Sequence, residues 1–171
     1  LSIADALRRR TPGAKVWVFG TPRPIDRQLV PAAGLELIEQ PVRPLPPMSR
    51  PWHWPGFVLA WRQSCAMVRA FIDEHQPDAV VGLGGYAAGP AVTIAARLGI
   101  TTAILNPDAI PGRANHYLAK RADRVFCQWG ETVEHLPQPA LARVPGCPTR
   151  NGIDAHDPYA ARRALGLEEE K

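Results

Sequence analysis

The sequence predicts an α/β fold, with a Rossmann-like parallel sheet and helices on both of its faces. Short apolar segments alternate with segments of helical periodicity along the chain, which is typical of parallel sheets. Ala79-Val80-Val81 is a short apolar run of the kind that forms a strand buried on both faces. A glycine-rich loop and a helical segment follow this run directly, as in the strand–loop–helix units of such sheets.

The chain is expected to begin with a helix followed by a strand. Ser2–Arg10 has helical spacing, with Ser2 as a candidate N-terminal cap and Pro12 as part of the stop. Lys15–Phe19 is rich in valine and aromatic residues, as strands are. The next expected elements are a helical turn at Ile25–Val30 and a second strand at Leu35–Glu39.

A proline-rich segment then precedes a long helix. Pro41–Pro55 contains six prolines, so it is expected to be a loop rather than a regular helix or an inner strand. From Phe57 to about His75, apolar residues recur near helical spacing, which predicts a long helix. These residues are Phe57, Ala60, Trp61, Cys65, Val68 and Ile72.

The remaining elements continue the alternation, and Pro90 suits the first turn of the helix after the glycine-rich loop. The other expected strands are Thr102–Leu105, Arg124–Cys127 and Leu141–Val144, and the other expected helices are Gly112–Arg121 and Pro158–Leu165. Ligands of such folds bind outside the carboxyl ends of the strands, so the loops after the strands should share one rim. These loops are residues 20–24, 82–89, 106–112 and 145–151.

The order of the first elements differs from that of a complete doubly wound sheet, which opens with a strand and a phosphate-binding loop. Here the first residues are already helical. We therefore expect the first strand and the first glycine loop to be missing from this chain. Their loss would leave an open cleft in the sheet, unpaired backbone and marginal stability.

Composition excludes several classes of protein. The 171 residues suffice for one domain with a core, and no apolar run approaches the roughly 20 residues that span a bilayer. The three cysteines are widely spaced, which favours a reduced cytoplasmic setting over a disulfide or zinc framework. The net charge of +4 suits an anionic partner such as a phosphate or a membrane surface. The arginine clusters lie on ordinary helix faces without a recognised nucleic-acid-binding module.

The glycine-rich loop is the first candidate binding site. Gly82, Gly84, Gly85 and Gly89 lie between the predicted strand and the predicted helix. In this arrangement, backbone N–H groups and the helix dipole face an anion such as phosphate. The spacing matches neither the dinucleotide fingerprint nor the P-loop. A tight turn whose glycines only relieve steric strain therefore remains an open alternative.

The loop also belongs to a longer pattern. Gly84–Pro90, which reads GGYAAGP, is its most specific block. Weaker matches occur in the same order at Gly20-Thr21, Leu29-Val30-Pro31, Trp61-Arg62-Gln63, Pro77-Asp78, Leu98-Gly99-Ile100, Leu118-Ala119-Lys120 and Gly146–Arg150. With these motifs, residues 1–150 resemble the N-terminal domain of the MurG family, the bacterial peptidoglycan N-acetylglucosaminyltransferases of the GT-B fold.

The resemblance implies an activity for the complete protein: inverting transfer of N-acetylglucosamine from UDP-GlcNAc to undecaprenyl-diphosphate-muramyl-pentapeptide, which converts lipid I to lipid II. It implies no essential metal, no cofactor, and a peripheral location on the cytoplasmic face of the plasma membrane. Residues 1–150 would be the acceptor-binding domain, and residues 151–171 a linker and helix leading to an absent C-terminal donor-binding domain. The implied partners are both substrates, the membrane surface and that domain, with no nucleic acid.

The resemblance also implies roles for individual residues. Gly84, Gly85, Tyr86 and Ala87 would face the acceptor diphosphate, and packing is the alternative for Tyr86. Arg150 would contact the donor UDP-GlcNAc, unless it is a plain surface residue before a linker.

Two departures from the family pattern matter. The family has His-Glu-Gln-Asn where this chain has Leu105-Asn106-Pro107-Asp108. Asp108 would contact the donor sugar as a hydrogen-bond acceptor, and capping of the following turn is its alternative role. The family's general base lies in a loop expected upstream of Leu1, and His116 is the nearest substitute, although a surface histidine is the simpler view. We therefore assign no catalytic residue, and this fragment alone is expected to be inactive.

A membrane contact is expected in the proline-rich segment, where bulky aromatic residues alternate with arginines. Arg50, Trp52 and Trp54 should face lipid, because indole rings prefer the headgroup interface and arginine attracts anionic lipid. Trp61 should face inward, since it lies at helical spacing with apolar residues.

Two other functions stay open. One is a non-catalytic, membrane-docked subunit that completes a split glycosyltransferase. The other is a glycolipid transferase of the same fold with a different acceptor, such as diacylglycerol.

Overall fold

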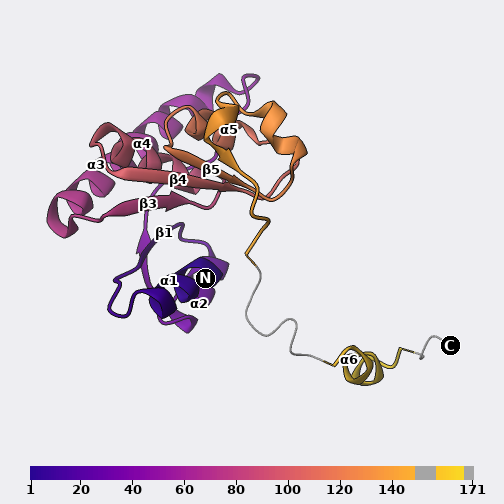
Figure 1. Cartoon of the computed structure of the whole chain (residues 1–171). Helices are drawn as coiled ribbons and strands as arrows, with labels where there is room; N and C mark the ends of the chain where they lie inside the picture. The colour runs from indigo at the N-terminus through magenta and orange to yellow at the C-terminus, as the bar shows by residue number, and fades with distance from the viewer. Residues whose placement is uncertain (149–156, 168–171) are drawn as a thin grey trace. The chain divides into compact units, whose positions relative to one another are not determined.

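The structure is a computed structural model, and it describes residues 1–148 and 157–167. The chain divides into two compact units. Val16–Cys147 forms the larger unit, which contains the strands, and Leu1–Lys15 groups with Pro148–Lys171. Figure 1 shows the course of the chain through both units.

The smaller unit contains α1 (Ser2–Arg10) and α6 (Pro158–Ala164). The bounds of α1 confirm the predicted helix, but the predicted cap is wrong. Leu1 occupies the cap position and Ser2 is already helical, so the first turn has no side-chain cap. In α6, by contrast, the Asp157 side chain accepts a hydrogen bond of 3.0 Å from the Tyr159 N–H.

The strands are parallel and form two sheets, which confirms the predicted α/β class (Figure 1). The first sheet pairs β1 (Trp17–Gly20) with β2 (Glu36–Glu39), joined by α2 (Pro24–Ala32). The second has the order β3 (Ala79–Gly82), β4 (Thr101–Asn106), β5 (Arg124–Cys127) and β6 (Ala142–Arg143). Among the described residues, no strand pairing joins β1 to β3, so the strands form two separate sheets.

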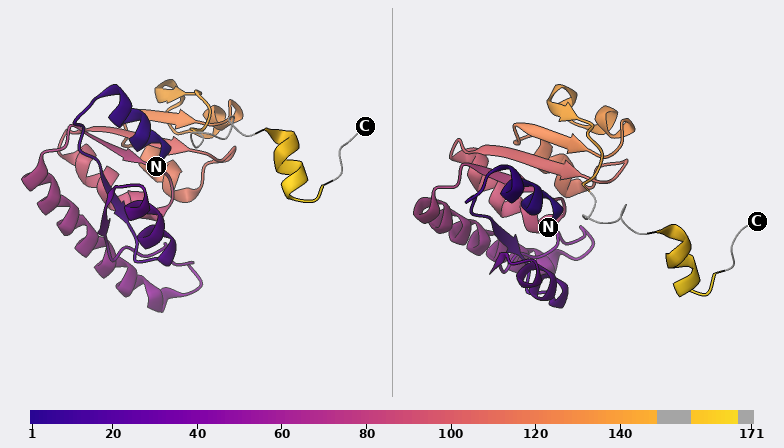
Figure 2. Two further views of the ribbon diagram at one scale, coloured as in Figure 1. Left: turned by 90° about the horizontal axis from the view of Figure 1, so that it is seen from below. Right: turned by 60° about the horizontal axis from the view of Figure 1, so that its bottom comes forward.

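The helices of the larger unit are α3 (Trp54–His75), α4 (Gly89–Arg97) and α5 (Arg113–Ala119). Short 3-10 turns occupy Pro51–His53, Tyr86–Ala88, Glu131–His135 and Pro139–Leu141. Helix α3 begins three residues before the predicted start at Phe57. Pro55 permits this earlier start, because it lies in the first turn, where its missing N–H costs no helical hydrogen bond. Figure 2 shows α3 running beside the strands.

Two apolar clusters form the core of the larger unit. The first surrounds the central strands and includes Ile104, Val125 and Cys127, all fully buried. The second lies between α3 and α4 and includes Val68 and Ala95. Phe19 of β1 and Val80 of β3 both pack against this second cluster, so α3 and α4 connect the two sheets through side-chain packing.

The expectation that Ala79-Val80-Val81 is buried on both faces is wrong. Val80 packs against the core, but Val81 is 46% exposed and Ala79 is exposed as well. The reason is position, since β3 is the outer strand of its sheet and, in the part of the chain that the structure describes, pairs with β4 alone. The apolar run of β3 therefore has one side chain packed on the core, Val80, and two exposed side chains, Ala79 and Val81.

Candidate functional site

The glycine-rich loop leaves the carboxyl end of β3 and enters α4. Gly84 and Gly85 adopt φ values of +88° and +74°, a region that side chains strongly disfavour. A Cβ atom on Gly85 would meet no atom within 4 Å, and Gly85 is exposed. The predicted candidate site is therefore open to solvent at a strand end, as a binding loop requires.

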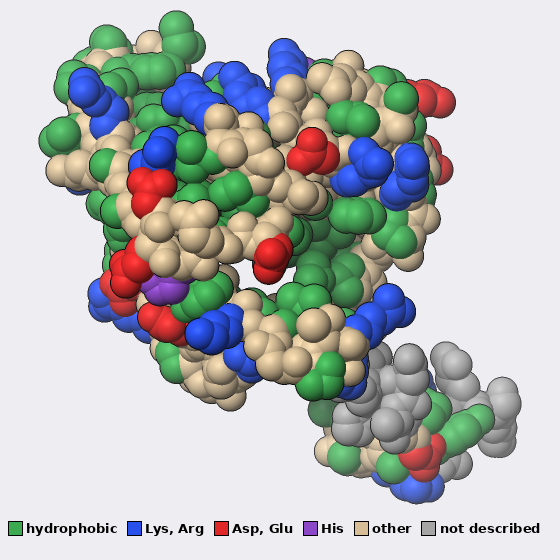
Figure 3. All heavy atoms as spheres, turned by 60° about the vertical axis from the view of Figure 1, so that its left-hand side comes forward, with side chains coloured by type: hydrophobic (Ala, Val, Ile, Leu, Met, Phe, Trp, Pro, Cys, Tyr) green, Lys and Arg blue, Asp and Glu red, His purple; other side chains and the backbone are tan. Residues whose placement is uncertain are grey.

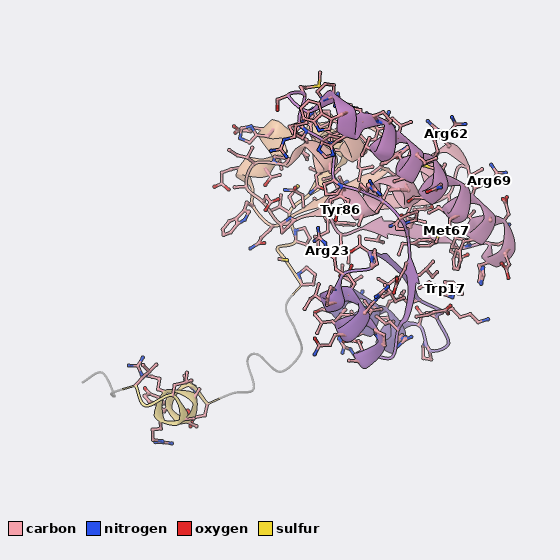
Figure 4. The ribbon with its side chains drawn as sticks, turned by 180° about the vertical axis from the view of Figure 1, so that it is seen from behind. Trp17, Arg23, Arg62, Met67, Arg69 and Tyr86 are labelled. Carbon is pink, nitrogen blue, oxygen red and sulfur yellow. The ribbon has the colours of Figure 1, made fainter. Side chains whose placement is uncertain are left out.

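Two further loops come close to this one. β3 and β4 are parallel neighbours, so the loop of residues 107–112, which follows β4, begins at the same edge of the sheet as the glycine-rich loop. The loop after β1 reaches the glycine-rich loop through Arg23, whose Nη2 donates a 2.6 Å hydrogen bond to the hydroxyl of Tyr86 (Figure 4). The fourth loop of the predicted rim, 145–151, extends beyond the described residues.

A buried glutamine supports the loop from the β2 side. Gln40 follows β2 and is only 1% exposed. Its Nε2 donates a 2.7 Å hydrogen bond to the carbonyl oxygen of Ala87, while its Oε1 has no partner among the described groups. The main chain of the loop is thus fixed by a residue from the other sheet.

Two buried asparagines support the loop from the β4 side. Asn115 of α5 donates from Nδ2 to Oδ1 of Asn106 at 2.7 Å, and it lies against Gly84. The Nδ2 of Asn106 and the hydroxyl of Thr132 both donate to the carbonyl oxygen of Asp108. These contacts fix the main chain at Asp108 and leave its side chain exposed.

Sequence reasoning missed this buried amide network. The sequence did contain a signal for this network. Asn106 at the end of a strand and Asn115 in a helix are polar residues at positions that face the core. Buried polar side chains require hydrogen-bond partners, and so they indicate a fixed arrangement.

The turn after β1 is also held by a side chain. Asp26 Oδ2 accepts hydrogen bonds from the hydroxyl (2.7 Å) and the N–H (2.9 Å) of Thr21. These two bonds, and more weakly the charge of Arg23, hold the pKa of the Asp26 carboxyl below its usual value. The carboxylate therefore stabilises the turn that carries Arg23.

Comparison with known proteins assigns the chain to a family. Residues 1–127 match the model of the glycosyltransferase family 28 N-terminal domain. The chain belongs to this family. The match includes the glycine-rich loop, the buried amide network and Asp108, but it ends before Arg150.

Curated relatives of this family 28 domain share one name. A Desulforudis audaxviator protein is 34% identical over 98% of this chain, and a Clavibacter sepedonicus protein is 36% identical over all of it. Both are named UDP-N-acetylglucosamine–N-acetylmuramyl-(pentapeptide) pyrophosphoryl-undecaprenol N-acetylglucosamine transferase. The chain spans less than half the length of these relatives, 44% and 46% respectively.

Solved structures support the fold. Acinetobacter baumannii MurG superimposes with a TM-score of 0.66 at 24% identity, covering 90% of this chain and 42% of that one. A structure of S. aureus MnaA with UDP gives a TM-score of 0.60 at 13% identity, covering 84% and 40%. At these identities the likeness concerns the fold alone.

Two candidate residues remain, and the structure describes only one of them. His116 is exposed on α5, as expected of a surface histidine. Arg150 lies outside the described residues. Within residues 1–148 and 157–167, no group of three or more His, Cys, Asp or Glu side chains is arranged to hold a metal ion.

The segment before α3 and the first turns of α3 carry exposed apolar side chains beside cations. Trp52 is 70% exposed. Trp54 is half-buried, and the centroid of its ring lies 5.9 Å from the centroid of the Phe57 ring. Trp61 packs against Gly89 of α4, so it faces inward as expected. Figure 3 shows Lys and Arg side chains with hydrophobic ones between them along the upper part of the molecule.

Arg50 lies at the edge of a shallow hollow in this segment. The hollow has a volume of about 290 Å³ and is largely apolar, and its lining consists of Arg43, Pro44, Leu45, Pro46, Pro47, Arg50, His53 and Phe57. In the described part of the chain, no helix is both long and apolar enough to cross a bilayer.

Proposed function

We propose that this family 28 domain is the acceptor-binding part of a glycosyltransferase. The complete enzyme would move N-acetylglucosamine from UDP-GlcNAc to undecaprenyl-diphosphate-muramyl-pentapeptide, in the lipid I to lipid II step of peptidoglycan synthesis. The names of relatives that align with nearly the whole chain support this substrate pair. The observation that carries the proposal is the open glycine-rich loop between β3 and α4.

The proposed ligand of this loop is the acceptor diphosphate. Gly84 and Gly85 permit the main chain to approach an anion, and the loop ends at the N-terminus of α4, where the helix dipole is positive. Tyr86 and Ala87 continue the loop, and their main chain is fixed by Gln40. Backbone N–H groups of such a fixed loop would donate to a diphosphate without a metal ion.

Donor binding is the second part of the proposal. The exposed side chain of Asp108, on a main chain fixed by Asn106 and Thr132, would accept hydrogen bonds from donor-sugar hydroxyls. Arg150 would contact the donor phosphate or ribose through its planar guanidinium. Residues 1–150 would then form the acceptor domain, with residues 151–171 leading to a donor-binding domain.

A peripheral contact with the cytoplasmic leaflet completes the proposal. The exposed Trp52 and its neighbour Trp54 would enter the headgroup region, and Arg50 would attract anionic lipid. Flotation with anionic vesicles tests this. Trp52→Ser/Trp54→Ser should reduce binding severalfold, whereas Trp129→Ser, a half-exposed indole after β5, should not. Undiminished flotation of the double variant would remove the membrane contact.

The main test measures equilibrium binding of a soluble, short-chain prenyl-diphosphate-muramyl-pentapeptide. Gly85→Ala should weaken binding at least tenfold, because a Cβ atom occupies the open side of the loop and disfavours its φ value. Gly99→Ala is the matched control. Gly99 also has a φ of +74° and open space around its Cβ position, but it lies at the opposite end of α4.

Competition separates the alternatives. Displacement of the muramyl ligand by diacylglycerol, but not by a prenyl diphosphate, would favour a glycolipid acceptor. Equal affinity of the wild type and Gly85→Ala would contradict the assignment of the loop.

A further inference from the structure

Arg23 has a fixed main chain beside the glycine-rich loop. It lies between Pro22 and Pro24 and caps α2 with an extended conformation (φ −72°, ψ 142°), to which a residue before proline is already biased. Its carbonyl oxygen accepts hydrogen bonds from Asp26 (3.1 Å) and Arg27 (3.2 Å). The two bonds from Thr21 to Asp26 lock the same turn.

The guanidinium of Arg23 lies over the residue that follows Gly85. Its Nη2 donates to the Tyr86 hydroxyl at 2.6 Å, and its Cζ lies 5.3 Å from the centroid of the Tyr86 ring. Figure 4 shows the two side chains meeting from their separate elements. The tyrosine thus holds a cation at the edge of the loop.

Most of the hydrogen-bonding capacity of this cation is unused. A guanidinium has five N–H donors, and within residues 1–148 and 157–167 the bond to Tyr86 is the only one that engages them. Among the described residues, no carboxylate lies within 4.0 Å of the Arg23 guanidinium. The nearby carboxylate of Asp26 already accepts two hydrogen bonds from Thr21 through its Oδ2.

The loop itself has no charge to offer an anion. Residues 82–90 contain no Lys, Arg, Asp or Glu, so their contribution is limited to backbone dipoles. A diphosphate carries formal negative charge, which a planar guanidinium can meet with two parallel hydrogen bonds. Arg23 is exposed and therefore accessible to such a ligand.

We propose that Arg23 is a direct ligand of the diphosphate, supplying the positive charge that the glycine-rich loop lacks, with Tyr86 as its positioning residue. This inference rests on the proposed function, because it concerns the same site. It adds a residue from the β1–α2 turn to a site otherwise built on β3 and α4.

The test is calorimetric titration of the whole chain with farnesyl diphosphate, a soluble isoprenyl diphosphate, and with farnesol as its uncharged counterpart. Arg23→Gln removes the positive charge and the planar guanidinium that can donate two parallel hydrogen bonds. Since hydrogen bonds to charged groups are strong, it should raise the dissociation constant for farnesyl diphosphate about ten- to one-hundredfold. Weak binding of farnesol should not change. Arg27→Gln is the matched control, because Arg27 pairs with Glu39 at 2.6 Å on the neighbouring surface.

The outcomes separate this inference from the function on which it rests. If Arg23→Gln binds farnesyl diphosphate as the wild type does while Gly85→Ala binds more weakly, Arg23 has no role and the loop assignment stands. Equal affinity of all three proteins, or no binding by the wild type, would overturn both. If farnesol binding is lost together with farnesyl diphosphate binding, the effect of Arg23→Gln is structural and the proposal fails.

A double-mutant cycle tests the positioning role of Tyr86. Tyr86→Phe removes the hydroxyl that accepts from Arg23 and keeps the ring. It should weaken farnesyl diphosphate binding in the wild type and have no further effect in Arg23→Gln, since the two side chains act through one contact. Additive losses in the cycle would show that Tyr86 does not act through Arg23.

Discussion

At the scale of single residues, Gly85 adopts a strained backbone conformation that shapes the glycine-rich loop. Its φ of +74° and ψ of 175° define a backbone region that essentially only glycine occupies. No atom lies within 4 Å of a Cβ placed there, so strain alone separates glycine from alanine. The conformation is required by the turn and not by crowding.

Gly85→Ala should therefore lower the free energy of unfolding by about 1–3 kcal/mol. Gly130 is a matched position of ordinary conformation, with φ −64°, ψ −39° and open space around it. Gly130→Ala should raise stability by about 0.4–1 kcal/mol, because it restricts the unfolded chain without strain. Urea unfolding of both variants measures this pair, and equal effects of the same sign would contradict the strain.

Asp26 gives a prediction for pH dependence. Its hydrogen bonds from Thr21 lower the pKa of the folded carboxyl, so its stabilising effect is present above the unfolded pKa of about 3.9 and is lost as pH falls further. Asp26→Asn keeps an acceptor oxygen but loses the charge. Its urea midpoint should lie below that of the wild type at pH 7, and the difference should shrink below about pH 4. A difference that is constant between pH 7 and pH 3 would rule out this linkage.

The sequence predicted the turn of the glycine-rich loop better than the side chains that fix it. Glycines at a strand end reveal a loop by their conformational freedom, and Gly84 and Gly85 were found in that way. Gln40 and Asn115 act through side chains that meet distant parts of the chain, over 47 residues in the case of Gln40 and Ala87. Local patterns do not contain such contacts.

At the scale of secondary-structure elements, the packing of α3 on α4 depends on one glycine. A Cβ atom on Gly89 would lie 2.7 Å from Cζ3 of Trp61, closer than real Cβ contacts allow. Gly89 lies in ordinary helical conformation, so it is needed for this close approach and not for its backbone. Two motifs that resemble those of the family thus meet in space: Trp61-Arg62-Gln63 and Gly84–Pro90.

Gly89→Ala should destabilise the chain, since overpacking costs about 1–3 kcal/mol and the gain in helix propensity is at most about 1 kcal/mol. In a Trp61→Leu background the same change should cost less, because the indole that it meets is gone. Urea unfolding of the four proteins gives the coupling energy. Additive effects would show that the ring moves aside freely.

Element boundaries were predictable where one local rule dominated. Arg124–Cys127 was predicted without error as β5, and α1 has the expected bounds. The start of α3 and the exposure of Val81 were missed for different reasons. Pro55 is compatible with a first helical turn, and whether a strand lies at an edge depends on its neighbours in space.

At the scale of the whole larger unit, two sheets are connected without strand pairing. Arg23–Tyr86 and Gln40–Ala87 bridge them by hydrogen bonds at the glycine-rich loop, and the α3–α4 cluster bridges them by packing. β1 and β2 form a sheet of only two strands, which is marginal on its own. β4 and β5 have neighbours on both sides and fully buried side chains.

Hydrogen exchange followed by mass spectrometry should therefore separate the two sheets. The amides of β1 and β2 should exchange at least about tenfold faster than those of β4 and β5, because local opening of the smaller sheet exposes less apolar surface. The same protection in both sheets would mean that they open as one unit.

The central claim is that the glycine-rich loop binds the acceptor diphosphate, and NMR of the isotope-labelled chain tests it most directly. Titration with the short-chain prenyl-diphosphate-muramyl-pentapeptide should give the largest shifts at the backbone amides of Gly84, Gly85, Tyr86 and Ala87, with Gly99 unchanged. Largest shifts at residues remote from this strand end, or no shifts at all in the loop, would contradict the account.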